Sequence, residues 1–137
     1  MEKLTVIKIG GNIVDNNEKL DIFLSQLATI DGSKILIHGG GKIATQLSKS
    51  LGIEAKMIAG RRVTDEETIK VVTMVYAGLV NKTIVAKLQS LSKNAIGLSG
   101  ADGNVIKAHK RLVKHDAIDY GYVGDIDTVD ADFLKSL

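Results

Sequence analysis

The sequence contains no cysteine and no proline. The absence of cysteine excludes several kinds of site and of covalent chemistry. Without cysteine there is no disulfide framework, no thiol nucleophile and no zinc site built from thiolates. Because disulfides mark oxidising compartments, a cytoplasmic protein is the simplest expectation. The absence of proline stands beside fourteen glycines. Glycine is therefore expected to shape the loops and to let the backbone approach a ligand closely.

The sequence also has no large excess of charge of one sign and no long apolar run. Eighteen basic residues face sixteen acidic ones, so bulk charge does not favour nucleic acid as a partner. No apolar run approaches the ~20 residues that a membrane span needs. Residues 1–4 lead directly into a predicted strand, so no signal peptide is expected. A length of 137 residues, 45% of them hydrophobic, fits one globular domain or half of a two-lobed enzyme.

Two strand–turn–helix units follow one another at the start of the chain. The β-branched stretch 4–9 predicts a buried strand, two glycines end it, and apolar residues at helical spacing predict a helix over 18–30. A second strand over 34–38 leads through three glycines into a helix around 43–51. Tandem units of this kind predict an α/β fold with a mainly parallel sheet.

The rest of the chain is less regular. Strands are expected over three short stretches: 53–58, 94–98 and 105–112. A loop is expected over 60–63. Thr64 and Glu67 fit a capping box, which predicts a helix from there to about Leu91 with a break near Gly78.

The last third of the sequence separates its charges. Basic residues cluster over 107–114, and six aspartates follow over 116–132 with no lysine or arginine among them. A final helix is predicted from Asp130, and the sequence stops inside it. We therefore expect this chain to be a piece of a longer protein.

The two glycine turns form the first candidate site. Ligands of open α/β sheets bind at the carboxyl ends of the strands, where helix N-termini offer unpaired N–H groups. The glycines concerned are Gly10, Gly11, Gly39, Gly40 and Gly41. Strand alternation places Lys8 on the side of Gly10, from where its ammonium can reach an anion held at the turn. The alternatives are that the glycines only make tight turns and that Lys8 only extends into solvent.

Arg61 and Arg62 precede the predicted long helix and form a second candidate site. Arginine grips a carboxylate with two parallel hydrogen bonds, which lysine cannot do, although a solvated basic pair is the alternative. His38 has no second histidine at ligand spacing, so no metal site made of protein side chains is expected.

Known phosphate-binding motifs match only in part. A P-loop fails because Lys42 is followed by Ile43 and not by serine or threonine. The stretch 39–44 fits the dinucleotide pattern G-x-G-x-x-A. The acidic residue expected ~20 positions later is missing, because Glu54 comes too early. A dinucleotide-binding oxidoreductase of the Rossmann type therefore stays an alternative.

Taken in order, these motifs resemble the amino acid kinase family, and within it the acetylglutamate kinases. Six stretches carry the resemblance: 8–11, 38–41, 60–64, 77–82, 97–103 and 122–125. The resemblance implies a three-layer αβα sandwich with a mainly parallel sheet. It implies that 1–137 is the N-terminal lobe, which binds an acyl-amino acid and dimerises, and that the C-terminal ATP-binding lobe is absent from this chain.

The resemblance also implies ATP-dependent phosphorylation of the γ-carboxylate of N-acetyl-L-glutamate in arginine biosynthesis, with Mg²⁺ carried by the nucleotide. Lys8 is the implied catalytic residue, which stabilises the transferring phosphoryl group. Three glycines are implied to bind phosphate: Gly10, Gly11 and Gly41. Four residues are implied to bind the acyl-amino acid: Gly40, Gly41, Arg62 and Asn81.

The implied chemistry agrees with the composition of the site. A glutamate side chain, with a pKa of about 4.3, is ionised at neutral pH and attacks without a general base. Phosphoryl transfer then depends on positioning and on charge stabilisation. We expect a homodimer, no membrane partner and little activity from this chain alone. An N-succinyl substrate and a non-catalytic binding or dimerisation module stay alternatives.

Overall fold

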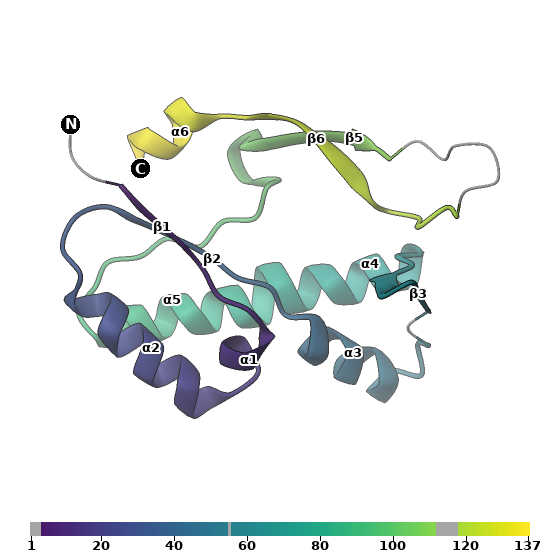
Figure 1. Ribbon diagram of the computed structural model, residues 1–137, viewed down its shortest axis with the longest axis horizontal. Coiled ribbons are helices and arrows are strands. Elements are labelled where there is room, and N and C mark those ends of the chain that lie inside the picture. The colour runs from purple at the N-terminus through teal and green to yellow at the C-terminus, as the bar shows by residue number, and fades with distance from the viewer. Residues whose placement is uncertain (1–3, 55, 112–117) are drawn as a thin grey trace.

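A parallel pair of strands carries the N-terminal part of the fold (Figure 1). The structure is a computed structural model that describes residues 4–54, 56–111 and 118–137. Strand β1 (Thr5–Lys8) pairs in parallel with β2 (Lys34–Ile37), in a register that sets Lys8 opposite Ile37. The predicted α/β class and the parallel sheet are thereby confirmed.

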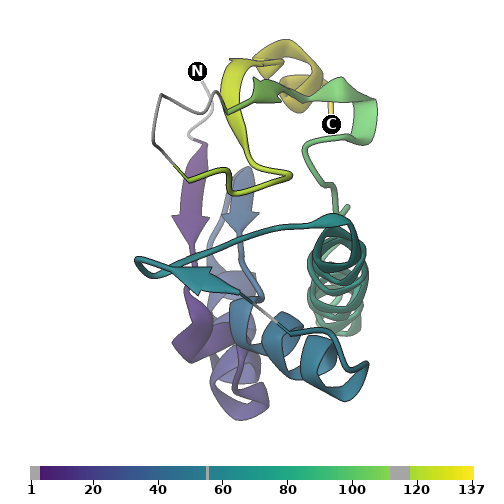
Figure 2. The ribbon, with the colours of Figure 1, turned by 90° about the vertical axis from the view of Figure 1, so that its right-hand side faces the viewer.

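Helices follow each strand, as the alternation of apolar and glycine segments predicts. They are α1 (Gly11–Val14), α2 (Asn17–Thr29) and α3 (Gly41–Ser50). Side chains alternate along β1, so that Ile7 and Ile9 pack into the core while Val6 and Lys8 are exposed on the opposite face. Figure 2 shows the two strands side by side, with the long helix of the chain seen end-on beside them.

The long helix is continuous over Glu66–Ser90 and consists of three segments. They are α4 (Glu66–Thr73), the π-helix η1 (Met74–Val80) and α5 (Asn81–Ser90). Its N-cap is Asp65, whose carboxylate accepts from the Thr68 N–H at 2.9 Å. The prediction of Thr64 as N-cap is wrong, because Thr64 instead pairs its backbone with Tyr120 and Tyr122 at 2.8 and 2.7 Å.

The predicted break near Gly78 is also wrong, since the π-helix η1 bridges this point without interrupting the helix. Val75 and Val80 are both buried although they are five residues apart. An α-helix would bring residue 79 to the core side. Leu79 instead leaves 57% of its surface exposed, against 4% for Val80. The wider π-turn thus shifts the buried face by one residue.

The helix Glu66–Ser90 is long and apolar enough to cross a membrane, by length and composition alone. The prediction missed this stretch because charged residues, Lys70 and Lys82 among them, interrupt it. Four of its side chains are buried in the core: Val71, Val75, Val80 and Ile84. Core helices of soluble proteins can be as long and as apolar, so this property is weak evidence for a span.

A short hairpin stands where the sequence predicted a strand followed by a loop. Strand β3 (Met57–Ile58) pairs antiparallel with β4 (Arg61–Arg62) through a two-residue turn. Ala59 and Gly60 in this turn both have positive φ, 48° and 76°, which favours the tight hairpin turn. The predicted strand over 53–58 is therefore shorter than expected. The two arginines lie in a strand and not in a loop.

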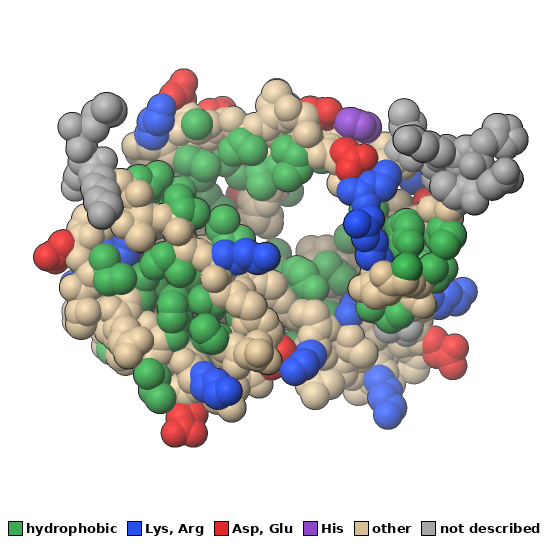
Figure 3. Space-filling model, in the orientation of Figure 1, with side chains coloured by type: hydrophobic (Ala, Val, Ile, Leu, Met, Phe, Trp, Pro, Cys, Tyr) green, Lys and Arg blue, Asp and Glu red, His purple; other side chains and the backbone are tan. Residues whose placement is uncertain are grey.

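The C-terminal part forms an arm of one hairpin and one helix. It comprises the 3₁₀ turn η2 (Asp102–Asn104), β5 (Ile106–Lys110), β6 (Gly124–Val129) and α6 (Ala131–Ser136). The strand predicted over 105–112 and the final helix are confirmed, although Leu112 lies outside the described residues. Figure 3 shows an opening between this arm and the helical body, with hydrophobic side chains on the arm beside it.

The stretch 94–98 does not form the predicted strand, since it joins no ladder among the described residues. Its carbonyl groups accept from side chains of the neighbouring helix α5. The Lys82 ammonium donates to the Gly97 carbonyl at 2.7 Å, and the Asn81 amide donates to the Leu98 carbonyl at 3.4 Å. Side chains of α5 thus satisfy acceptors that a neighbouring strand would otherwise satisfy.

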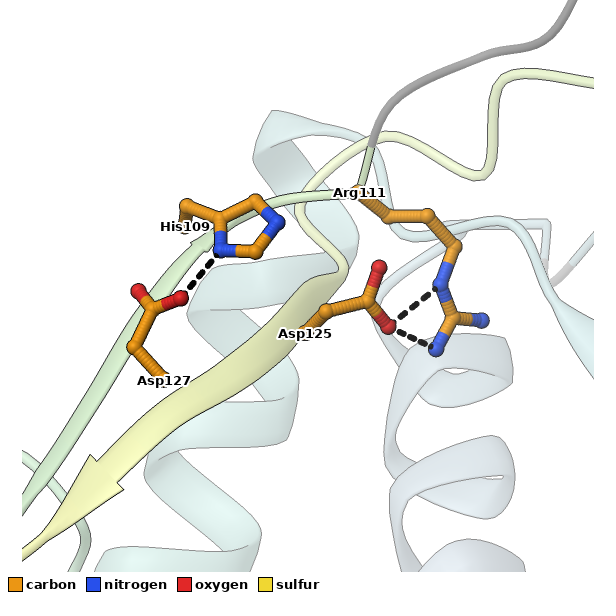
Figure 4. A network of polar contacts seen from close by, with 4 residues as sticks. All are labelled: His109, Arg111, Asp125 and Asp127. Carbon is orange, nitrogen blue, oxygen red and sulfur yellow. Dashed lines mark hydrogen bonds and ion pairs between the residues drawn. The ribbon is translucent and has the colours of Figure 1, made fainter.

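The separated charges of the sequence meet across the β5–β6 hairpin (Figure 4). The Arg111 guanidinium donates from Nε and Nη2 to one Asp125 oxygen, at 3.0 and 2.6 Å. His109 Nδ1 lies 2.6 Å from an Asp127 oxygen. Register shifts between Lys107 and Ala108, which leaves Asp127 without a direct partner in the ladder. Within the described residues, Lys110 and Arg111 of the basic cluster therefore pair with aspartates that follow it in the sequence.

Acid titration of Asp125 is expected to report this pairing. Its hydrogen bond to Arg111 lowers the pKa of the Asp125 carboxyl below the usual value, and the same bond raises the pKa of Arg111. A depressed carboxyl pKa stabilises the folded hairpin above the ordinary pKa of about 3.9, and this stabilisation is lost as pH falls through the folded-state value. Carbon-13 NMR should show the Asp125 midpoint rising in Arg111→Gln. Lys135→Gln, in α6, should leave it unchanged. An unchanged midpoint in Arg111→Gln would contradict the assignment.

Candidate functional site

A cleft of about 600 Å³ opens where the two glycine turns meet α3, β4 and η1. Its lining comes from segments far apart in the sequence: Gly11, Asp15, Gly39, Gly40, Gly41, Lys42, Thr45, Gln46, Lys49, Met57, Arg62 and Tyr76. Five residues that the sequence singled out meet here: Gly11, Gly39, Gly40, Gly41 and Arg62. The structure thus joins the two predicted sites, the glycine turns and the arginine pair, in one cleft.

The second glycine turn is tight because it packs directly on the long helix. Gly40 is the N-cap of α3, and Gly41 is its first residue. A Cβ atom on Gly40 would lie 3.0 Å from the Tyr76 ring and 3.3 Å from Val75 Cγ1. The turn therefore needs glycine for close approach to η1. The N-terminus of this ten-residue helix is directed to the cleft region, where its first N–H groups have no intrahelical partner.

Arg62 is anchored to α3 by one of its two terminal nitrogens. Arg62 Nη2 donates to the Gly41 carbonyl at 3.0 Å and to the Thr45 hydroxyl at 2.6 Å. Its Nη1 atom is buried and has no hydrogen-bond partner among the described residues. A guanidinium in this state is oriented and retains donors that match a carboxylate.

Charge in the cleft favours an anionic ligand. Lys42, Lys49 and Arg62 line it together with a single carboxylate, Asp15. Asp15 Oδ2 lies 4.0 Å from the Lys42 ammonium, and both Asp15 oxygens are buried without a hydrogen-bond partner in the described part of the chain. The carboxylate also lies over the first glycine turn, since a Cβ on Gly11 would come within 2.7 Å of it.

Three predicted site residues do not line this cleft: Lys8, Gly10 and Asn81. Lys8 ends β1 on its exposed face. Asn81 is 7% exposed and its amide lies 3.2 Å from Nε2 of His38, whose Nδ1 lies 3.0 Å from the Gly39 carbonyl. Asn81 thus connects α5 to the residues just before the second glycine turn. Its roles in binding, like those of Lys8 and Gly10, stay predictions.

Sequence reasoning missed seven lining residues: Asp15, Lys42, Thr45, Gln46, Lys49, Met57 and Tyr76. Helical spacing offered a signal for part of them, since Thr45 and Lys49 follow Gly41 at intervals of four residues on α3. No such signal was available for Tyr76, because the π-helix sets the side from which it reaches the turn.

The sequence of the chain matches a known protein family and several of its members. The model of the amino acid kinase family matches residues 3–137. A protein named acetylglutamate kinase from Cytophaga hutchinsonii is 60% identical over 129 residues, which cover 94% of this chain and 48% of that protein. Another of that name from Parabacteroides distasonis is 58% identical over 137 residues, which cover all of this chain and 53% of that protein. The chain spans about half the length of the curated relatives it matches.

Solved structures share the fold. The protein smu.665 from Streptococcus mutans superimposes with a TM-score of 0.73 at 24% identity, over 97% of this chain and 53% of that one. N-acetylglutamate synthase from Neisseria gonorrhoeae, solved with coenzyme A and N-acetyl-glutamate, gives a TM-score of 0.74 at 25% identity over 97% of this chain and 30% of that one. With a family model that matches nearly every residue, the chain belongs to the amino acid kinase family.

Proposed function

We propose that this chain forms the acyl-amino-acid-binding lobe of an acetylglutamate kinase, with ATP as phosphoryl donor. The observation that carries the proposal is Arg62, whose Nη2 is held by α3 while its buried Nη1 has no partner among the described residues. This arrangement suits the α-carboxylate of an amino acid. The names of relatives at 58% and 60% identity support the same substrate.

The cleft has the chemistry to hold a second anionic group beside that carboxylate. In the proposal, backbone N–H groups at the two glycine turns bind oxygens of the transferred phosphoryl group, from Gly10, Gly11 and Gly41. Gly40 and Gly41 border the acyl-amino acid. Asn81 contributes indirectly, through its contact with His38 ahead of the second turn. Lys42 and Lys49 add positive charge along the same wall.

The proposed reaction needs no general base. An oxygen of the ionised γ-carboxylate attacks the γ-phosphorus of ATP, and the bond from this phosphorus to the β–γ bridging oxygen breaks. The products are an acyl phosphate and ADP. Mg²⁺ carried by the nucleotide would neutralise phosphate charge. Lys8 stabilises the charge on the transferring group, and the glycine turns and Arg62 align the two reactants.

The proposed step belongs to arginine biosynthesis in the cytoplasm. Acetyl is preferred over succinyl because the relatives' name specifies acetylglutamate. The family to which the chain belongs does not favour a dinucleotide-binding oxidoreductase. A non-catalytic binding or dimerisation module stays the alternative for this chain on its own.

The activity can be tested in the protein as its gene encodes it. An acyl phosphate reacts with hydroxylamine to a hydroxamate, which ferric iron reveals as a coloured complex. N-acetylglutamate with Mg-ATP should give this product, whereas N-succinylglutamate, aspartate and carbamate should give far less. If only N-succinylglutamate gave product, the substrate would carry a succinyl and not an acetyl group. If none of the four compounds gave product, the proposal would be overturned.

We further propose a homodimer that forms through the long helix. Met74 and Leu79 leave 51% and 57% of their surfaces exposed on this helix, although both are large and apolar. Light scattering after size exclusion should give twice the protomer mass at micromolar concentration. Leu79→Glu should give monomer, because it would bury a carboxylate in an apolar contact. Ile22→Glu, at a similarly exposed site on α2, should stay dimeric. A monomeric wild type would contradict the proposal.

A further inference from the structure

Thr45 connects Arg62 to helix α3 through one hydroxyl. Its Oγ1 accepts from Arg62 Nη2 at 2.6 Å and donates to the Gly41 carbonyl at 2.9 Å. The same carbonyl accepts from Arg62 Nη2 at 3.0 Å. The three groups thus form a closed polar triangle between β4 and the first turn of α3.

The triangle uses both hydrogens of Arg62 Nη2 and the hydroxyl hydrogen of Thr45. Nη2 of a guanidinium carries two hydrogens, and the triangle offers it two acceptors. A threonine hydroxyl has one hydrogen, which Gly41 takes, and lone pairs that face Arg62. Because both hydrogens of Nη2 are used in hydrogen bonds, the plane of the guanidinium is fixed. Nη1, which has no hydrogen-bond partner among the described residues, is thereby held in one orientation.

Local helix geometry sets the hydroxyl before any ligand arrives. Thr45 lies four residues after Gly41, and a helical threonine readily bonds the carbonyl of residue i−4. Because threonine is β-branched, its χ1 angle has few alternatives. Arg62, in contrast, comes from a two-residue strand at the end of a short hairpin. The rigid Thr45 side chain on α3 therefore holds the long Arg62 side chain, which comes from the short strand β4.

We propose that Thr45 is a positioning residue for the acyl-amino acid: its hydroxyl orients the Arg62 guanidinium so that Nη1 meets the α-carboxylate. The proposal rests on the proposed function for the identity of the ligand. The Thr45–Arg62 contact itself does not depend on that identity. Substrate binding should be sensitive to the hydroxyl, whereas ATP binding and turnover should not.

Kinetics of the full-length protein test the role with variants of matched shape. Thr45→Val keeps the branched shape without the hydroxyl, and Thr45→Ser keeps the hydroxyl. Thr45→Val should raise KM for N-acetylglutamate about tenfold, as for a lost hydrogen bond to a charged group. Its kcat and its KM for ATP should stay within about twofold, and Thr45→Ser should be close to wild type. Thr29→Val is the control, because the Thr29 hydroxyl also bonds a carbonyl of its own helix, at 2.8 Å, but contacts no arginine.

Side-chain NMR of Arg62 separates this proposal from the proposed function. Slow rotation about Nε–Cζ should give distinct Nη signals in wild type and Thr45→Ser, and averaged signals in Thr45→Val. Thr45→Ala, which favours helix, replaces Thr45→Val if that variant does not fold. A wild type that phosphorylates nothing would overturn the proposed function, and the NMR result would then decide whether Thr45 orients Arg62. Unchanged Arg62 signals without the hydroxyl, or equal shifts in both KM values, would overturn the role of Thr45.

Discussion

Lys8→Ala in the full-length protein is expected to lower turnover about 10²–10³-fold, the effect of removing one charge stabiliser from a transition state. Lys8 stands at the end of β1, two residues before the first glycine turn, on the face opposite Ile7 and Ile9. Its side chain makes no hydrogen bond or ion pair with the residues that the structure describes, so the fold should not depend on this side chain. The loss should therefore fall on kcat.

Steady-state kinetics with both substrates and thermal melting measure these two effects separately. Lys19→Ala is the control, because Lys19 is an exposed lysine on α2 away from the cleft. It should match wild type in kcat and in Tm. Turnover in Lys8→Ala that equals wild type would remove Lys8 from the reaction. A large fall in Tm would instead assign it a structural role.

Arg62→Lys is expected to raise KM for N-acetylglutamate about 100-fold, within the range for truncating one partner of a buried charge pair. Arg62 holds α3 with Nη2, while its buried Nη1 has no hydrogen-bond partner among the described residues. An ammonium retains the charge but lacks the planar fork, so it cannot serve both partners in this geometry. KM for ATP should change by less than about threefold, because the α-carboxylate belongs to the other substrate.

Arg61→Lys provides the matched control on the neighbouring residue. Arg61 is exposed, and no hydrogen bond of its side chain joins it to other described residues. Its replacement should leave both KM values close to wild type. Equal rises in KM for both substrates in Arg62→Lys would indicate that Arg62 supports the fold of the cleft and does not bind the α-carboxylate.

The sequence correctly predicted those helices and strands whose formation depends on short stretches of neighbouring residues. Apolar β-branched stretches ended by glycine predicted β1 and β2, and apolar spacing predicted α2 and α3. The helix start was missed by one residue because two capping residues, Thr64 and Asp65, are adjacent. The choice between them depends on Tyr120 and Tyr122, whose backbone groups pair with Thr64 from more than fifty residues away. No local pattern contains that contact.

The candidate site was predictable to a similar extent. Glycine turns and paired arginines have local signatures, and Gly11, Gly40, Gly41 and Arg62 do meet in the cleft. Asp15 and Tyr76 were missed because their part in the cleft depends on how α1 and η1 pack against the turns. Side chains recruited by tertiary packing leave no spacing signal in the chain.

The π-helix η1 makes one position of the long helix tolerant to the loss of a residue. The buried positions Thr68, Val71 and Val75 follow α-helical steps, and Val80 and Ile84 resume them after a step of five. Deleting one residue between Val75 and Val80 would turn that step into a regular four and keep every buried position on the core side. A deletion elsewhere in α4 or α5 would rotate the following side chains by about 100° away from the core. Related chains that differ in length by one residue can therefore accommodate the difference inside this helix.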